Sequence, residues 1–287
     1  MRPIIFGEVL FDCFPDGSVV LGGAPFNVAW NLHAFGLNPL LISRVGDDPL
    51  GREIRGAMQA HGMECSGLQL DSAHPTGTVE VTLDKGQPSY EIVAERAWDF
   101  IDHRQIPPLR EPLLLYHGSL AARHAVSAES LWQLRKRAEG AIFLDVNLRD
   151  PWWSREQLTA LLHGVRWIKL NDAELESLAT AQADPAACRA AWGSEQLILT
   201  RGEAGAELWS ANAPVVRIAP SGRVVVADTV GAGDAFASVL LVGLLRSWSL
   251  ADTLHRAQAF ASQVVTLRGA TTTDRAFYRR VVEGWGG

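Results

Sequence analysis

At 287 residues, 47% apolar and 20% charged, the chain has the composition of a soluble globular protein and enough length for one large domain or two smaller ones. Its formal net charge of -6 and its lack of a basic run argue against a nucleic-acid or anionic-membrane partner, and no apolar run approaches the roughly 18 residues of a membrane span. Cys13, Cys65 and Cys188 are far apart and form no C-x-x-C pair, which argues against a disulfide framework or a zinc site and fits a cytoplasmic protein.

Short apolar runs alternate along the chain with longer segments of helical period. This is the pattern of repeated βα units around a mostly parallel sheet, so we predict an α/β protein. The predicted strands cover residues 3–6, 40–44, 113–117, 141–146, 166–170 and 196–200. The predicted helices cover residues 26–36, 48–62, 127–139, 172–179, 232–246, 250–267 and 274–284.

The stretch from Thr76 to Val93 breaks this alternation, because its apolar residues repeat with period 2 on both sides of Lys-Gly-Gln-Pro. That pattern predicts an antiparallel hairpin, which would pair with a short strand at Val19–Leu21 to make a small sheet outside the main one. With nothing in its own sequence to cover its apolar face, the small sheet should close over a ligand or a second subunit.

We therefore expect residues 1–287 to form a single domain with an inserted lid made from about 14–23 and 75–98. Gly22 and Gly23 lack a Cβ atom and predict either a hinge for this lid or a tight turn.

A glycine-containing loop opens the predicted helix at 232–246, where the chain reads D-T-V-G-A-G-D from Asp228 to Asp234. Backbone N–H groups of a first helical turn lack intrahelical partners and lie at the positive end of the helix dipole, so Gly231, Ala232 and Gly233 predict an anion site. Beside a bound phosphate, Asp234 has a natural task as the base that accepts the proton of an attacking hydroxyl. The alternative is an ordinary carboxylate at a helix start, stabilised by the same dipole.

The D-T-V-G-A-G-D segment resembles the second signature of the ribokinase-like (PfkB) carbohydrate kinases. The segment Gly22-Gly23-Ala24-Pro25-Phe26-Asn27-Val28-Ala29, with the later run Arg44-Val45-Gly46-Asp47-Asp48-Pro49-Leu50-Gly51, looks like the first signature. Gly7-Glu8-Val9-Leu10-Phe11-Asp12 looks like the opening strand and turn of the family. The resemblance extends from about residue 4 to about residue 273. It implies a three-layer α/β/α sandwich with a small antiparallel β lid, and an ATP-dependent sugar kinase that uses Mg²⁺.

By this resemblance, Asp12, Gly22, Gly23 and Asn27 would bind the hydroxyls of a sugar. Asp145-Val146-Asn147-Leu148-Arg149 resembles the D-x-N-x-R of fructokinase-like members, and Arg149 would clamp a phosphate with its planar guanidinium. Without the resemblance, Asp12 reads as a solvated turn, Asn27 as a capping residue and Arg149 as a surface residue.

The nucleotide site is implied in the same way. Asn171-Asp172-Ala173-Glu174 resembles the N-x-x-E of the family, in which Glu174 organises Mg²⁺ through water and Asn171 lies near the phosphates. These two residues also fit an N-cap and the N3 position of a helix, and both interpretations can hold together. Near the nucleotide, the family has a T-x-G-x-x-G turn, which Thr200, Gly202 and Gly205 match. The resemblance also places the adenine near 258–265, and a monovalent cation such as K⁺ at the carbonyls of Asp228 and Val230 and the Gly269 loop.

Asn147, Asn171 and Thr200 each follow a predicted strand, and ligands of open α/β sheets bind at the carboxyl ends of the strands. His117 and Ser119 fall at the same edge, but no second histidine stands at metal spacing, which favours a structural role for His117.

Fructose is the sugar that the motifs favour, because Gly23-Ala24-Pro25-x-Asn27 together with D-x-N-x-R looks fructokinase-like. A kinase for 2-keto-3-deoxygluconate, or for another sugar or nucleoside, is the alternative within the class, since Arg96 near the lid could meet a substrate carboxylate. A non-catalytic sugar or nucleotide sensor is the alternative from another class. We further expect a homodimer formed through the lid.

Overall fold

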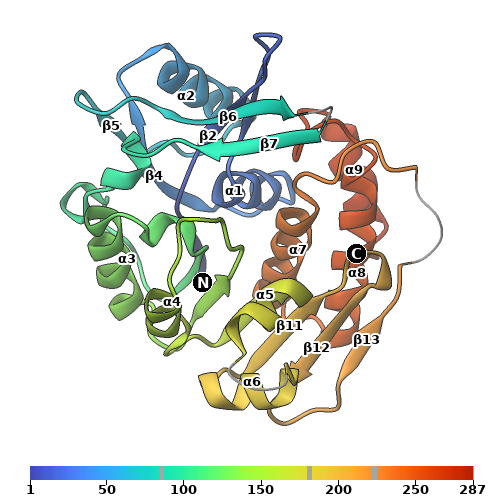
Figure 1. The fold of residues 1–287 in the computed structure, drawn as a ribbon. Helices are drawn as coiled ribbons and strands as arrows, with labels where there is room; N and C mark the ends of the chain where they lie inside the picture. Colours follow the sequence, from blue (N-terminus) through green and yellow to red (C-terminus); the bar gives the residue numbers. More distant parts are fainter. Residues whose placement is uncertain (85–86, 180–182, 221–224, 287) are drawn as a thin grey trace.

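A nine-stranded sheet forms the centre of the fold in the computed structural model, which describes residues 1–84, 87–179, 183–220 and 225–286 (Figure 1). Its strands, in spatial order, are β13 (Val216–Ile218), β12 (Ala206–Ser210), β11 (Gln196–Thr200), β10 (Trp167–Asn171), β9 (Ile142–Asp145), β8 (Leu113–His117), β1 (Arg2–Phe6), β4 (Leu40–Gly46) and β5 (Leu68–Asp71). The strands from β11 to β5 run parallel, and β12 and β13 continue the sheet antiparallel at one edge.

The strand residues divide between two apolar cores, because successive side chains of a strand point to opposite faces of the sheet. In β1, Ile5 packs into one core, whereas Ile4 and Phe6 pack into the other. The first face is covered by α1 (Ala24–Ala34), α2 (Pro49–His61), α7 (Ala232–Arg246), α8 (Leu250–Val264) and α9 (Arg275–Glu283). The second face is covered by α3 (Ala125–Arg137), α4 (Arg155–Leu162), α5 (Asp172–Leu178) and α6 (Pro185–Trp192). The predicted three-layer α/β/α sandwich is therefore confirmed.

The strands and helices predicted from periodicity are confirmed, with small shifts at their ends. The prediction missed short elements, whose stability comes from packing against the rest of the molecule more than from their own residue pattern. These are the helices α4 and α6, the strands β2 (Leu10–Cys13), β5, β12 and β13, and the 3₁₀ turns η1 (Ala97–Phe100), η2 (His103–Gln105), η3 (Leu120–Ala122) and η4 (Gly202–Ala204).

A separate four-stranded sheet has the order β3-β2-β6-β7, with β3 (Val19–Gly22), β2 (Leu10–Cys13), β6 (Gly77–Asp84) and β7 (Gln87–Ile92). The predicted hairpin is β6–β7, although its turn at 85–86 lies outside the described residues. β2 pairs antiparallel with β3 and parallel with β6. Figure 1 shows this small sheet at the top of the molecule, close to α1 and α2. Val19, Val20 and Tyr90 are 43%, 38% and 51% exposed, so the sheet presents apolar side chains to solvent.

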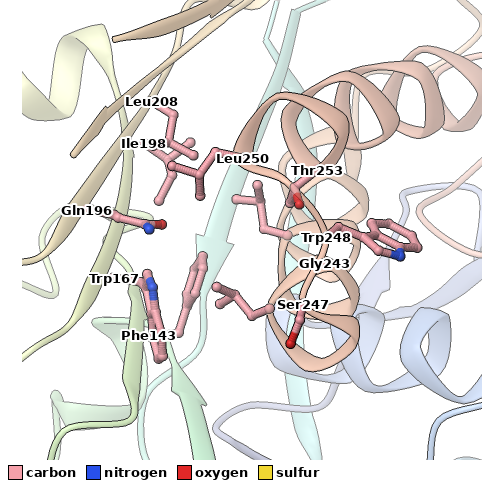
Figure 2. Close-up of a pocket in the computed structure, with 12 residues that line it drawn as sticks. Phe143, Trp167, Gln196, Ile198, Leu208, Gly243, Ser247, Trp248, Leu250 and Thr253 are labelled. Carbon is pink, nitrogen blue, oxygen red and sulfur yellow. The ribbon is translucent and has the colours of Figure 1, made fainter. Parts of the chain in front are cut away.

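In the described part of the chain, every helix is too short or too polar to cross a membrane. A cavity of about 110 Å³ lies between the sheet and the α7–α8 connection (Figure 2). Trp167 and Gln196, the first residues of β10 and β11, line it opposite Trp248 and Thr253. The cavity is therefore at the amino ends of these strands, away from the edge where the sequence predicts ligands.

Helices α7 and α8 touch closely at Gly243, where an added Cβ atom would overlap the side chain of Thr253. We predict that Gly243→Ala lowers the free energy of unfolding by about 1–3 kcal/mol, as overpacking in a core does. Gly56→Ala is the matched control, because Gly56 is also helical but has nothing within 4 Å of its added Cβ. That variant should raise stability by about 0.5–1 kcal/mol. Urea unfolding of both variants checks this, and equal effects would contradict it.

Candidate active site

The predicted anion site is the first turn of α7. Gly231 is the N-cap with φ of +79°, and a Cβ atom there would collide with Ala270. Only glycine fits this left-handed backbone against so close a neighbour. Ala232, Gly233 and Asp234 follow as the first three helical residues. Ala232 N makes a long hydrogen bond to Thr229 O at 3.4 Å, whereas the N–H groups of Gly233 and Asp234 have no backbone partner among the described residues. The positive end of the helix dipole therefore lies beside a carboxylate.

Asp234 is joined to the first motif by a hydrogen bond. The Nδ2 atom of Asn27 in α1 donates to Asp234 Oδ2 at 2.8 Å, across 207 residues of sequence. The other amide atom, Asn27 Oδ1, is buried and accepts no hydrogen bond from the described residues. The two segments that resemble the family signatures thus meet at one point, with an oxygen left free to accept a bond from a ligand.

Several groups act on the proton affinity of Asp234. Burial raises the pKa of its carboxyl above the ordinary value, and the negative charge of Asp145 raises it further. The hydrogen bond from Asn27 and the positive charges of Lys169 and Arg149 lower the pKa. Asp234 is therefore a partly buried carboxylate whose proton affinity depends on nearby cations.

Two more carboxyl groups approach the same place from the segment after β1. Burial raises the pKa of Glu8 to about 7, and the charge of Asp234 adds to this effect. Burial raises the pKa of Asp12 to about 6, with a further increase from Asp228. Gly23 lies against this segment so tightly that a Cβ atom would be 2.7 Å from Glu8 O, and Gly22 lies beside the Asp12 carboxylate.

Glu8 was not among the predicted site residues. Its side chain is 4% exposed, and its Oε2 atom has no hydrogen-bond partner among the described residues. An unpartnered carboxyl oxygen in a buried position is unusual, because such a group loses its contact with water without compensation. The G-E-V sequence gave no sign that Glu8 would be fully covered.

Arg149 lies in the turn after β9, where Asn147 has φ of +40°. Its guanidinium is exposed and donates to the carbonyl oxygen of Leu148 at 3.0 Å. Its positive charge lowers the pKa of Glu8, Asp12 and Asp234 together. The structure therefore brings Arg149 within electrostatic reach of all three carboxyl groups.

Asn171 and Glu174 form the predicted capping box at the start of α5. Asn171 Oδ1 accepts from Glu174 N at 2.9 Å, and Glu174 Oε2 accepts from Asn171 N at 2.8 Å. Glu174 Oε1 accepts from Leu148 N at 2.9 Å, which ties α5 to the turn that carries Arg149. Each oxygen of this buried carboxylate keeps a lone pair free, which fits contact with the water shell of Mg²⁺. Within the described ranges, no cluster of three or more His, Cys, Asp or Glu side chains could hold a metal directly.

Thr200 lies beside Asn171 at the ends of the parallel strands β11 and β10. The following turn is closed on itself, since Arg201 N donates to Gly205 O at 2.8 Å. Gly202 and Gly205 have φ of +52° and +95°. Arg201 pairs with Asp172 at 2.7 Å and with Glu207 at 3.4 Å, so its charge is used to fix the turn.

Asp228 connects the loop before α7 to the end of the chain. Its carboxylate accepts from Val230 N at 3.0 Å and from Gly269 N at 3.2 Å. Asp228 N also donates to Val265 O, at the end of the 258–265 segment. These contacts bring the residues predicted near adenine and a monovalent cation to the start of α7.

His117 is fully buried at the end of β8 and accepts a hydrogen bond from Arg135 on Nε2, with Nδ1 against Gly118 O at 2.8 Å. Burial and the Arg135 charge lower its pKa to about 3, so the ring is neutral. This agrees with the structural role predicted for it. Ser119 is buried in the next turn, and nothing in its contacts indicates a ligand.

A buried ion pair, between Lys169 and Asp145, was also not predicted. Lys169 Nζ is 2.9 Å from both carboxylate oxygens of Asp145, and Tyr116 OH donates to the same carboxylate at 3.2 Å. Lys169 lies in an apolar strand pattern, W-I-K-L-N, which gives no sign of its partner. Only the register of β9 and β10, in which Lys169 stands opposite Asp145, reveals the pair.

Arginine donors without a partner lie near the base of the small sheet. Arg123 binds Asp99 through Nε and Nη2 at 2.7 Å and stacks on Trp98, but its buried Nη1 has no acceptor among the described residues. The buried Nε of Arg96 likewise has no acceptor among the described residues. Both are cationic groups with a free donor.

Known proteins of one family match most of the chain. The model of the pfkB family carbohydrate kinases matches residues 14–276. The chain is 31% identical to a fructokinase of Klebsiella pneumoniae, over 93% of this chain and 94% of that protein.

Solved structures give the same result. An aminoimidazole riboside kinase from Salmonella enterica, complexed with aminoimidazole riboside and an ATP analog, matches with a TM-score of 0.86 at 26% identity, over 98% of this chain and 100% of that chain. A fructokinase from Vibrio cholerae O395, bound to fructose, ADP and calcium ion, matches with a TM-score of 0.83 at 25% identity, over 97% and 98% of the two chains.

The buried Glu8 predicts a dependence of stability on pH. Its pKa is raised from 4.5 to about 7 on folding, so between these values the folded chain holds a proton that the unfolded chain has released. Stability should therefore fall as pH rises through this window. The Glu8→Gln variant should lack this loss. The difference in free energy of unfolding between the wild type and Glu8→Gln should therefore change by up to about 3 kcal/mol across this pH window.

Urea unfolding at pH values from 4 to 8 measures this difference. Glu129→Gln, at an exposed glutamate of α3, is the control and should follow the wild type at every pH. Parallel curves for the wild type and Glu8→Gln would refute the assignment of the shift to Glu8.

Proposed function

The chain belongs to the pfkB family of carbohydrate kinases and is a phosphotransferase that acts on sugar hydroxyls, and from that premise we propose that it transfers the γ-phosphoryl group of ATP to fructose. The hydrogen bond between Asn27 and Asp234 is the observation that carries this proposal. It brings a sugar-binding segment and a phosphate-binding helix start to the same point, as transfer between two bound substrates requires.

In the proposed reaction, Asp234 accepts the proton of the attacking sugar hydroxyl. The N–H groups of Gly231, Ala232 and Gly233 hold the oxygens of the transferred group, on which negative charge is spread in the transition state. Asn27 keeps Asp234 oriented, because its amide hydrogen bond fixes one carboxylate oxygen and leaves the other for the hydroxyl.

The sugar binds among polar groups that have unused hydrogen-bonding capacity. Asn27 Oδ1 and Glu8 Oε2 are buried oxygens with no partner among the described residues, and each can bond a hydroxyl. Asp12, the backbone at Gly22 and Gly23, and Arg149 complete the sugar site. A polyol satisfies such a set better than an apolar ligand would, because unpaired buried polar groups lower affinity.

ATP lies along the carboxyl ends of β10 and β11, with Asn171, Thr200, Gly202 and Gly205 near the phosphates and residues 258–265 near the adenine. Mg²⁺ would be held through water by Glu174, where it would neutralise charge on the phosphates. A monovalent cation such as K⁺ would bind at the carbonyls of Asp228 and Val230. The support for this last site is the Asp228 carboxylate, which holds Val230 and Gly269 together.

The whole chain acts as one domain, whose small sheet, with the segments at about 14–23 and 75–98, serves as a lid. Exposed Val20 and Tyr90 lie on the same face of this lid, as the strand registers show, and a second copy of the chain would cover them, so we assign a homodimer through the lid. A monomer in sedimentation equilibrium would rule this out. The reaction is assigned to the cytoplasm, where ATP is available.

A second substrate class has support from Arg96 and Arg123. Their unpartnered buried donors would match the carboxylate of a sugar acid such as 2-keto-3-deoxygluconate. Fructose remains the first choice, because Gly23-Ala24-Pro25-x-Asn27 and the D-x-N-x-R turn at Arg149 resemble fructokinases.

Asp234→Asn should lower kcat by about 10²-fold or more, because the amide cannot accept the hydroxyl proton. Asp252→Asn is the matched control, since Asp252 has the same N3 position in α8 and is exposed. A coupled assay of ADP release measures both variants. The role of Asp234 would be excluded by a turnover close to wild type in a folded Asp234→Asn enzyme.

Among fructose, ribose, 2-keto-3-deoxygluconate and aminoimidazole riboside, fructose should give the largest kcat/KM, by about tenfold or more over the others, the scale on which a few pocket contacts discriminate between substrates. The same ADP-release assay, run across these substrates, gives the ranking. A preference for the ketodeoxy acid that disappears in Arg96→Gln would replace the fructose assignment with the sugar-acid one.

A further inference from the structure

The buried pair of Lys169 and Asp145 lies directly beneath the proposed phosphate site. The side chains of Lys169 and Asp145 are 7% and 3% exposed, and they come from the neighbouring strands β10 and β9. Tyr116 on β8 donates the third hydrogen bond of the cluster. All three side chains lie near the carboxyl ends of their strands, at the edge where ATP is placed.

The ammonium group of Lys169 lies close to the start of α7. A Cβ atom added to Gly233 would be 3.5 Å from Lys169 Nζ, an ordinary contact distance, so the positive charge sits against the residue before Asp234. A buried ion pair is by itself weak evidence for stability, because apolar residues of similar volume often serve as well. Its position next to the base therefore indicates a second role.

We propose, as an extension of the kinase function above, that Lys169 and Asp145 are positioning residues that set the ionisation of Asp234 and support the Gly231–Gly233 turn. Asp145 holds Lys169 on the sheet and prevents it from pairing directly with Asp234. Lys169, held in this way, keeps a positive charge beside the carboxylate without occupying the oxygen that must receive the hydroxyl proton.

The electrostatics agree with this arrangement. Lys169 lowers the pKa of Asp234 and Asp145 raises it, so the two members of the pair act in opposite directions. Without a nearby cation, burial would keep Asp234 protonated up to a higher pH than it is in this site. A protonated carboxyl group cannot act as a base. The other groups that act on Asp234, or on which its charge acts, come from several elements; they are Glu8, Asn27, Tyr116 and Arg149.

The test uses three variants of the full-length enzyme. Lys169→Met removes a positive charge near Asp234, so the acidic limb of the pH profile of kcat/KM should move to higher pH by about one unit or more. Asp145→Asn removes a negative charge and should move it to lower pH. The double variant should fall between the two single variants, because both charges are lost.

A second readout does not depend on turnover. The ¹³C carboxyl resonance of Asp234, assigned by its absence in Asp234→Asn, should titrate with midpoints displaced in the same opposite directions. If the wild type phosphorylates no sugar while these midpoints move as expected, the proposed function fails and the role of the pair stands. If sugar is phosphorylated but the midpoints coincide in all the folded variants, the role of the pair is refuted.

Arg44→Met is the matched control, because Arg44 forms another buried ion pair, with Asp71 at 2.8 Å, on the far strands β4 and β5. It should lower the melting temperature and leave both midpoints unchanged. Should Lys169→Met fail to fold, Asp145→Asn keeps the volume of the site and decides the question alone. A midpoint for Asp145→Asn that is unchanged or higher than wild type overturns the proposal.

Discussion

The site depends on the convergence of two helix starts that are far apart in sequence. Helices α1 and α7 both begin after a glycine with positive φ, Gly23 at +108° and Gly231 at +79°, and each of these glycines lies too close to a neighbouring segment for a side chain to fit. The hydrogen bond between Asn27 and Asp234 joins the first turns of α1 and α7. Because both helices present their positive ends here, an anion and a carboxylate can share a space from which either would otherwise be repelled.

Buried and exposed charged groups of opposite sign surround Asp234. Glu8, Asp12 and Asp234 are carboxyl groups whose pKa values are raised by burial, while Lys169 and Arg149 supply positive charge. Lys169 is buried in the sheet with Asp145, whereas Arg149 lies on an exposed turn. In the proposed reaction, Lys169 sets the charge of the site before the substrates bind, and the exposed Arg149 contacts a bound phosphate.

The residue pattern was sufficient to predict a mostly parallel α/β sheet and the Gly-x-Gly-Asp helix start, because alternating apolar runs and a glycine turn are local signals. The three layers were implied by the family resemblance. It also predicted the capping box at Asn171 and Glu174, whose partners are three residues apart. Lys169 and Glu8 were not predicted as site residues, because the role of Lys169 depends on strand register and that of Glu8 on burial by segments distant in sequence. The missed elements β12 and β13 are short edge strands, which the rest of the sheet defines.

The small sheet is attached to the rest of the chain at four places. β2 follows β1 and β3 leads into α1, while β6 follows β5 and β7 leads into η1. Four covalent connections leave the small sheet fewer ways to move than a single connection would. Because β3 leads directly into α1, a movement of the sheet would be transmitted to Gly23 at the start of α1, and through Asn27 to Asp234.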